Sequence, residues 1–282
     1  LSPSVLFDSA YYAAQLLGPL TAEGTLLGHY LETGEEQGLK PNPLFDPDHY
    51  AEQSGNSAPN LLVHYVAIGG RAGLSPSVLF DSSWVLTQMP LAKERRMSPL
   101  EFYFRVGGEL EEGPHPLFLA SWYAGEHPEV AESGLDPLSH FMEIGAGKGY
   151  DPHPLFDSRW YRDAYASYFV EEMPAVFHYL RSGEAAGLSP NALFDAEWYG
   201  AQGSLDLRPG ETLFLHLCRK GMKERRSPSR LFPYCLQFFR DKDPARRARN
   251  VNPAGGYLVE EYADQSSPEA ELAIELPAVY SP

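Results

Sequence analysis

The chain has 282 residues, of which 43% are hydrophobic and 13% aromatic, so it is long enough to bury a substantial core. Its formal net charge of −16 argues against a general nucleic-acid-binding protein, because phosphate backbones attract basic surfaces. The sequence contains no run of about 20 apolar residues of the kind that spans a membrane. We therefore expect a cytoplasmic location, with membrane association arising only through partners.

A stretch similar to Pro-Leu-Phe-Asp recurs along the chain. Its phenylalanine is repeated after 38 residues at five of the six steps and after 35 at the other, at Phe7, Phe45, Phe80, Phe118, Phe156, Phe194 and Phe232. A fixed period of this size is typical of repeat arrays, in which each unit buries its apolar face against its neighbours. We predict an all-α solenoid of six two-helix units over residues 1–240, with a partial seventh unit from Phe232.

The first helix of each unit is expected directly after the phenylalanine. In the fifth unit, Asp157 stands at the N-cap position, where its carboxylate can accept an unpaired backbone N–H. Phe156 and Tyr161 then have the spacing of a hydrophobic staple. Four other units carry the same aspartate, at Asp8, Asp46, Asp81 and Asp195. The fourth unit has Leu119 instead, so we expect its first helix to begin less sharply.

The second helix of each unit follows after a linker, with its clearest start at Asp136-Pro137. Leu138, Phe141, Met142 and Gly145 lie at helical spacing and are expected to form one face. Glycines end this helix and suit a left-handed C-terminal cap, including Gly38, Gly73, Gly149 and Gly187. Glycine runs such as residues 145–149 resemble phosphate loops only weakly, because they follow helices and repeat with the period.

Histidines stand five residues before the first glycine that ends the second helix, at His29, His64, His140, His178 and His216. Five histidines at one position raise the possibility of metal binding. However, neighbouring helices pack about 8–10 Å apart, whereas a zinc ligand lies about 2 Å from its ion. We therefore expect no metal and no cofactor, and interpret each ring as hydrogen-bonded to an adjacent backbone carbonyl.

Aromatic rings also recur within the predicted first helices, led by Trp84, Trp122, Trp160 and Trp198. Rings exposed along a concave face would be able to stack on sugars, but rings at staple spacing are more simply explained as core. Cys218 occupies an apolar position of the second helix and is interpreted as a reduced core thiol. Asp241-Lys242-Asp243 resembles a cation-binding pair, although a solvated turn before Pro244 is the simpler interpretation.

Basic residues gather near the C-terminus, where residues 219–249 hold 11 of the 22 lysines and arginines. This cluster is the candidate docking surface for an acidic partner or for anionic lipid headgroups, and a solvated terminal face is the alternative. Its members are Arg219, Lys220, Lys223, Arg225, Arg226, Arg230, Arg240, Arg246, Arg247 and Arg249. Residues 241–282 are expected to form a linker or tail that is first basic and then acidic.

The pattern Ser121-Trp122-Tyr123, Asp136-Pro137-Leu138-Ser139-His140-Phe141, Gly145, Gly149 and Pro154-Leu155-Phe156-Asp157 resembles a bacterial helical repeat. Such repeats flank the catalytic domains of large bacterial glycosyltransferases, including those of surface polysaccharide assembly, and also occur in large surface proteins. The resemblance covers about residues 1–235. It implies an accessory helical region and transfers no catalytic residue to this chain.

These observations predict a non-catalytic scaffold or interaction module that positions a flanking catalytic domain or another protein. A carbohydrate-binding array that uses the aromatic rings is one alternative. An enzyme with an unrecognised glycosyltransferase-type site is another, although no catalytic residue can be assigned. The expected partner is a protein, with a glycan or an anionic membrane surface as alternatives and no nucleic acid.

Overall fold

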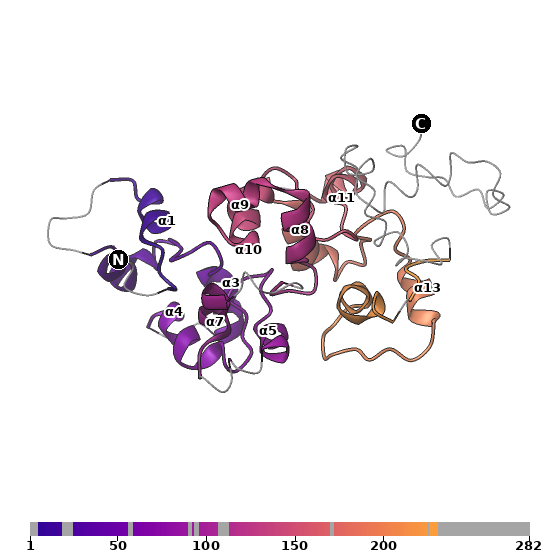
Figure 1. Cartoon of the computed structure of the whole chain (residues 1–282), viewed down its shortest axis with the longest axis horizontal. Helices are drawn as coiled ribbons and strands as arrows, with labels where there is room; N and C mark the ends of the chain where they lie inside the picture. The colour runs from indigo at the N-terminus through magenta and orange to yellow at the C-terminus, as the bar shows by residue number, and fades with distance from the viewer. Residues whose placement is uncertain are drawn as a thin grey trace. The chain divides into compact units, whose positions relative to one another are not determined.

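The computed structural model describes residues 5–18, 25–55, 59–89, 92, 96–106, 113–169, 172–224 and 226–230 (Figure 1). These residues form helices joined by turns, and no strand occurs among them. The only strand-like pairings in this part of the chain are isolated bridges between Ser77 and Phe80 and between His115 and Phe118. The predicted all-α class is therefore confirmed for the residues described.

The predicted first helices all form, and they are short. They are α1 (Ser9–Ala14), α3 (Pro47–Ser54), α5 (Ser82–Gln88), α8 (Ala120–Glu126), α11 (Ser158–Ala164) and α13 (Ala196–Ala201). Each of the five predicted aspartates accepts a hydrogen bond from a backbone N–H in the first turn of its helix. Leu119 makes no such bond at the start of α8, as its apolar side chain requires.

The second helices have a form that the sequence did not predict. Most consist of one α-helical turn followed by one π-helical turn. The pairs are α2 (Leu26–His29) with η1 (Tyr30–Gly34), α4 (Leu61–His64) with η2 (Tyr65–Gly69), α10 (Pro137–His140) with η4 (Phe141–Gly145), α12 (Ala175–His178) with η6 (Tyr179–Gly183), and α14 (Leu213–His216) with η7 (Leu217–Gly221). In the third repeat, α7 (Pro99–Val106) stays α-helical. Two further short helices are α9 (Glu129–Ser133) and the 3₁₀ turn η5 (Ala166–Tyr168).

The wider π turn changes which residues are buried. Tyr30 and Gly34 are buried as expected, but Leu31 is 42% exposed, although the α-helical pattern placed it on the same face. A π-helical turn contains more than four residues. Its later side chains therefore lie away from the apolar face that α-helical spacing predicts. Met142 and Cys218, at the same position of later repeats, are only partly buried. Cys218, interpreted from the sequence as a reduced core thiol, is a thiol that is only partly buried.

Rings from the two helices of each repeat form its core. The phenylalanine packs on the tyrosine five residues later with ring centroids 5.1–5.8 Å apart, in the pairs Phe7–Tyr12, Phe45–Tyr50, Phe118–Tyr123, Phe156–Tyr161 and Phe194–Tyr199. All of these tyrosines are fully buried. The predicted staple is thus confirmed, and the tyrosine is its buried anchor.

Five repeats are joined to the next by a backbone hydrogen bond from the residue after the repeat phenylalanine. This residue donates its N–H to a proline carbonyl in the segment that leads to the next repeat, at 2.9–3.2 Å. The pairs are Asp8–Pro41, Asp46–Pro76, Asp81–Pro114, Asp157–Pro190 and Asp195–Pro228. The recurrence of this bond fixes how each connecting segment lies against the helix before it.

Polar side chains also link the second helices of consecutive repeats. The carboxylate of Glu35 accepts a hydrogen bond from the Tyr30 hydroxyl at 3.0 Å and from the backbone N–H of Leu61 at 2.8 Å, which begins α4. In the third repeat, the Tyr103 hydroxyl donates to Asp136, the N-cap of α10, at 2.7 Å. A side chain of one repeat therefore hydrogen-bonds to the first residue, or to the N-cap residue, of the second helix in the next repeat.

The chain divides into two compact units, Leu1–Ile144 and Gly145–Pro282. The first unit contains the helices from α1 to α10, and the described part of the second contains those from α11 to α14. No helix in the described part of the chain has both the length and the apolar character needed to cross a membrane.

Candidate functional site

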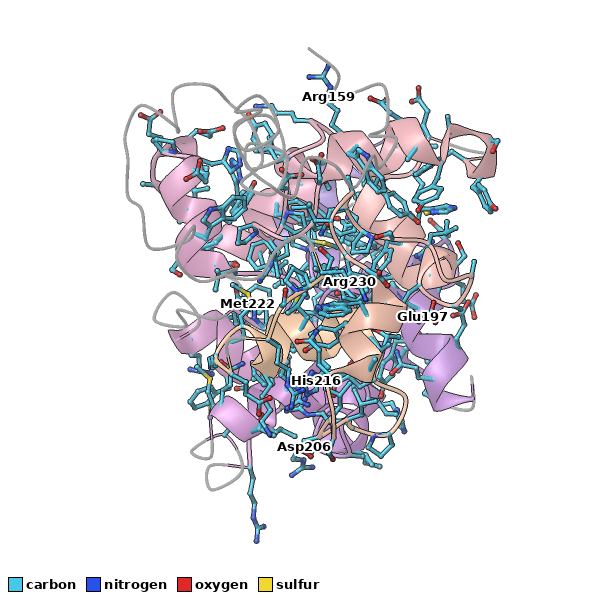
Figure 2. The ribbon with its side chains drawn as sticks, turned by 90° about the vertical axis from the view of Figure 1, so that its right-hand side faces the viewer. Arg159, Glu197, Asp206, His216, Met222 and Arg230 are labelled. Atoms are coloured by element: carbon cyan, nitrogen blue, oxygen red, sulfur yellow. The ribbon has the colours of Figure 1, made fainter. Side chains whose placement is uncertain are left out.

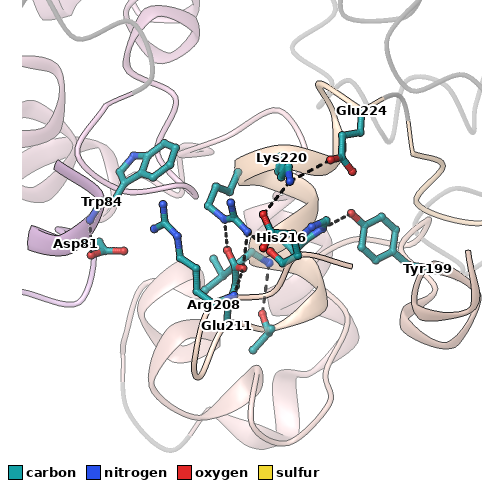
Figure 3. Close-up of polar contacts among 12 residues, drawn as sticks. Asp81, Trp84, Tyr199, Arg208, Glu211, His216, Lys220 and Glu224 are labelled. Atoms are coloured by element: carbon teal, nitrogen blue, oxygen red, sulfur yellow. Dashed lines mark hydrogen bonds and ion pairs between the residues drawn. The ribbon is translucent and has the colours of Figure 1, made fainter. Parts of the chain in front are cut away.

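The histidines of the second helices all bind a tyrosine of the first helix. In five repeats, the tyrosine hydroxyl lies 2.7–2.9 Å from the histidine Nδ1. The pairs are Tyr12–His29, Tyr50–His64, Tyr123–His140, Tyr161–His178 and Tyr199–His216, the last of which is drawn in Figure 3. We expected each ring to bind an adjacent backbone carbonyl, whereas the structure pairs its Nδ1 with a tyrosine hydroxyl from the first helix.

A glycine makes room for the hydroxyls of Tyr12, Tyr50, Tyr161 and Tyr199. A Cβ atom built on Gly183 would lie 1.9 Å from the Tyr161 hydroxyl oxygen, and the same conflict arises at Gly34, Gly69 and Gly221. The backbone at these four glycines is not left-handed, whereas Gly38, Gly73, Gly149 and Gly187 have φ values of 72–92°. The predicted left-handed cap therefore belongs to the later glycine, and the earlier one permits close approach.

Burial disfavours ionisation of the tyrosine in three of these pairs. Burial raises the pKa of Tyr50 to about 12 and also raises the pKa of Tyr12 and Tyr161. Burial likewise lowers the pKa of His216, which favours its neutral ring. A neutral tyrosine beside a neutral imidazole is a structural hydrogen bond and lacks the charge of an activated nucleophile.

The third repeat replaces this polar pair with apolar packing. Val85 and Phe102 stand where the other repeats have tyrosine and histidine, and both are buried. Phe102 forms a small core with Leu86 and Ala92, against which Met89 and Met97 also pack. Because both the tyrosine and the histidine are replaced by apolar residues, neither a hydroxyl nor a ring nitrogen is left without its partner at this position.

A second polar position, for which we made no prediction from the sequence, lies three residues before the phenylalanine of the second to seventh units. It holds Asn42, Ser77, His115, His153, Asn191 and Ser229, which are all buried at 1–7% exposure. The asparagine and histidine side chains accept the backbone N–H two residues later at 2.8–3.0 Å. Asn42 also donates to the carbonyl of Leu6 at 2.8 Å, across to the preceding repeat.

Glutamines near the end of the first helices clamp the next connecting segment. The Gln15 amide donates to the Lys40 carbonyl at 2.8 Å and accepts the Lys40 N–H at 2.9 Å. Gln53 makes the same pair of bonds with Ser75, and Gln202 makes it with Ser227. These glutamines lie eight residues after the repeat phenylalanine. This spacing can be read from the sequence, but we drew no prediction from it.

The tryptophans divide into two groups. Trp84 and Trp160 are buried at 7% and 6% exposure, as the core interpretation expects. Trp122 and Trp198 are only partly buried, and the Arg230 guanidinium lies 5.1 Å from the Trp198 ring centroid. Figure 2 labels Arg230 and also shows Arg159, the exposed neighbour of Trp160, pointing away from the ribbon.

The basic cluster is described only in part, and four of its described members bind within the sixth repeat. Arg219 pairs with Glu211, with one N–O distance of 2.8 Å, and their side chains are 9% and 7% exposed. Lys220 contacts Asp206 at 2.8 Å and Glu224 at 3.3 Å, and the contact with Glu224 is drawn in Figure 3. Arg226 also contacts Glu224, at 2.7 Å. Arg230 lies over Trp198, as described above. Cluster members Arg225, Arg240, Arg246, Arg247 and Arg249 lie outside the described residues.

Several other sequence predictions also fall outside the described residues, namely Phe232, Asp241-Lys242-Asp243 and the tail at 241–282. In the part of the chain that is described, no group of three or more histidine, cysteine, aspartate or glutamate side chains is arranged to hold a metal ion. The glycine run at 145–149 closes a second helix and contains the left-handed Gly149.

Comparison with known proteins gives this chain no relative. No family model matches it, and neither a curated protein nor a solved structure is significantly similar to it.

Proposed function

We propose that this chain is a non-catalytic helical scaffold, in which six two-helix repeats form a solenoid that positions a catalytic domain or another protein. The observation that carries the proposal is the use of the repeated polar side chains within the fold. The tyrosine–histidine pairs, the aspartate caps and the glutamine clamps each bind another part of the same chain. Because these side chains already form hydrogen bonds within the fold, they are not available as catalytic groups.

The burial of the aromatic rings supports a scaffold over a sugar-binding array. The tyrosines at the centre of the repeats are fully buried, and Trp84 and Trp160 are nearly so. Stacking on a sugar requires exposed ring faces, which among the four tryptophans only Trp122 and Trp198 offer in part. The resemblance of the sequence motif to repeats of bacterial glycosyltransferases is the reason for proposing a catalytic domain of polysaccharide assembly as the partner.

The test is binding of the full chain to two kinds of ligand. One is the protein encoded beside it, and the other is a panel of bacterial polysaccharides. We expect saturable binding to the protein, unchanged by Trp122→Ala and Trp198→Ala, and no binding to the glycans. Saturable glycan binding that these substitutions abolish would replace the scaffold proposal with the carbohydrate-binding alternative.

A second measurement addresses the basic cluster and the enzyme alternative. Replacement of Arg225 and Arg226 by glutamine, together with a salt titration, tests whether the cluster is the docking face, because exposed charges are screened by salt. Incubation of the full chain with sugar nucleotides and divalent cations tests for activity. Turnover of a sugar nucleotide would contradict a non-catalytic role.

A further inference from the structure

The buried polar position before each repeat phenylalanine differs in chemistry from junction to junction. At the junction between the first and second repeats it is Asn42, which does not titrate. At the junction between the third and fourth repeats it is His115, which is 7% exposed. Both accept the backbone N–H of the residue two positions later, Asn42 through Oδ1 at 2.9 Å and His115 through Nδ1 at 3.0 Å.

The bond to Nδ1 requires an unprotonated nitrogen. A histidinium donates from both ring nitrogens, so protonation of His115 removes the acceptor for the Leu117 N–H and places a charge in a buried site. Leu117 and Phe118 on the same segment are fully buried, and the neighbouring Pro114 carbonyl accepts the Asp81 N–H at 2.9 Å. Loss of this hydrogen bond therefore destabilises the segment that joins the third and fourth repeats.

The charged and titratable groups that face His115 come from two first helices of the same compact unit. Asp81, the N-cap of α5, favours the protonated ring, and His49 in α3 disfavours it. Burial outweighs the attraction of Asp81 and lowers the pKa of His115 to about 4. Burial alone lowers the pKa of His153, at the same position in the second unit, to about 3.

We propose that His115 makes the junction between the third and fourth repeats an acid-sensitive joint, which opens at a pH where the Asn42 junction stays closed. The ring must be neutral in the closed joint, whereas an open segment binds a proton with the ordinary histidine pKa of about 6.5. Opening is therefore favoured progressively as pH falls below about 6.5. This inference does not depend on what the scaffold binds.

The test exchanges the two side chains between junctions. Hydrogen exchange of the backbone is measured by mass spectrometry on the full chain at pH 7 and pH 5, with correction for intrinsic exchange rates. We expect the protection of residues 113–118 to fall about 20-fold in the wild type, from the pKa of about 4 in the closed joint and about 6.5 in the open one. His115→Asn should abolish most of this fall.

The reciprocal substitution Asn42→His should create the same pH dependence at residues 40–45, which keeps the proposal testable if His115→Asn fails to fold. A second measurement is ring ¹⁵N NMR, which should show His115 with an unprotonated Nδ1 and a neutral ring at pH 5. Equal loss of protection in the wild type and His115→Asn, or titration of the His115 ring near 6.5, would overturn the proposal.

Discussion

A tyrosine, a histidine and a glycine form the smallest unit of order in this chain. The Tyr161 hydroxyl binds His178 Nδ1 at 2.9 Å and lies where a Cβ of Gly183 would be. The three residues depend on each other, because the hydroxyl needs both a polar partner and a space without a side chain. The same arrangement recurs with Tyr12, Tyr50 and Tyr199.

Gly183→Ala should destabilise the protein by roughly 2–4 kcal/mol, because the new methyl group displaces the Tyr161 hydroxyl from its hydrogen bond. Tyr161→Phe alone should cost roughly 1–2 kcal/mol, since it leaves His178 Nδ1 unpaired. In the double variant the methyl group meets the ring carbon instead, at 3.2 Å. The double variant should therefore lose less than the sum of the two single losses in urea unfolding.

Gly125→Ala is the matched control for this substitution. Gly125 lies in α8, and a Cβ there would meet no atom within 4 Å. Alanine should stabilise the helix by roughly 0.5–1 kcal/mol. If the double variant loses the full sum of the stability losses of Tyr161→Phe and Gly183→Ala, the hydroxyl and the glycine do not interact as the structure indicates.

Residue spacing predicted the local contacts but not the distant ones. The aspartate caps and the Phe156–Tyr161 staple involve residues within five positions, so a single stretch contains all the information needed. The Tyr161–His178 bond joins residues 17 positions apart and depends on how the two helices pack. The tyrosine and histidine stand 17 positions apart in four repeats and 14 apart in the second, and this spacing does not by itself identify which atom binds Nδ1.

At the scale of elements, the helices are short and depend on their ends. The first helices contain six to eight residues, which is too short for stability in isolation. Their N-caps and their packing against the second helices must therefore stabilise them. The π turns of the second helices were not predictable from sequence. A single π turn that ends at a glycine has the same hydrophobic pattern as an α turn that ends at that glycine.

Leu119→Asp should supply the cap that α8 lacks. The other first helices gain a side-chain hydrogen bond from aspartate at this position, and such a cap is worth roughly 0.5–2 kcal/mol. Partial burial of Leu119 reduces the gain, so we expect an increase in unfolding free energy of about 0.5 kcal/mol. Asp195→Ala should lose about 1 kcal/mol. Thermal unfolding followed by circular dichroism measures both, and a loss on Leu119→Asp would contradict the capping argument.

The ion pair of the sixth repeat ties its linker to its second helix. Burial acts to raise the pKa of Glu211, but hydrogen bonds from Arg219 and from the Arg208 backbone outweigh it and hold this pKa below its ordinary value. Arg219→Met should therefore cost roughly 2–4 kcal/mol, because it leaves a buried carboxylate without its partner. The double variant with Glu211→Met should recover much of this loss.

Lys220→Met is the control for that ion pair. Its partner Asp206 has a side chain 76% exposed, so the contact is weak and is screened by salt. Urea unfolding at low salt and at about 0.5 M NaCl separates the two cases, since only the loss at Arg219 should persist at high salt. Equal and salt-sensitive losses at both positions would show that the Arg219–Glu211 pair is also solvated.

At the scale of the molecule, the period of 38 residues predicts that a whole repeat can be removed. Deletion of residues 156–193 joins Leu155 to Phe194 and restores the Pro-Leu-Phe-Asp-like stretch in register. In a solenoid each repeat contacts only its neighbours, so the shortened chain should retain its helical signal per residue and unfold at a somewhat lower temperature. Deletion of residues 156–185 is the matched control, because it removes most of a repeat but joins unlike positions. Loss of helical structure in both variants would count against the solenoid, since a closed domain has no removable unit.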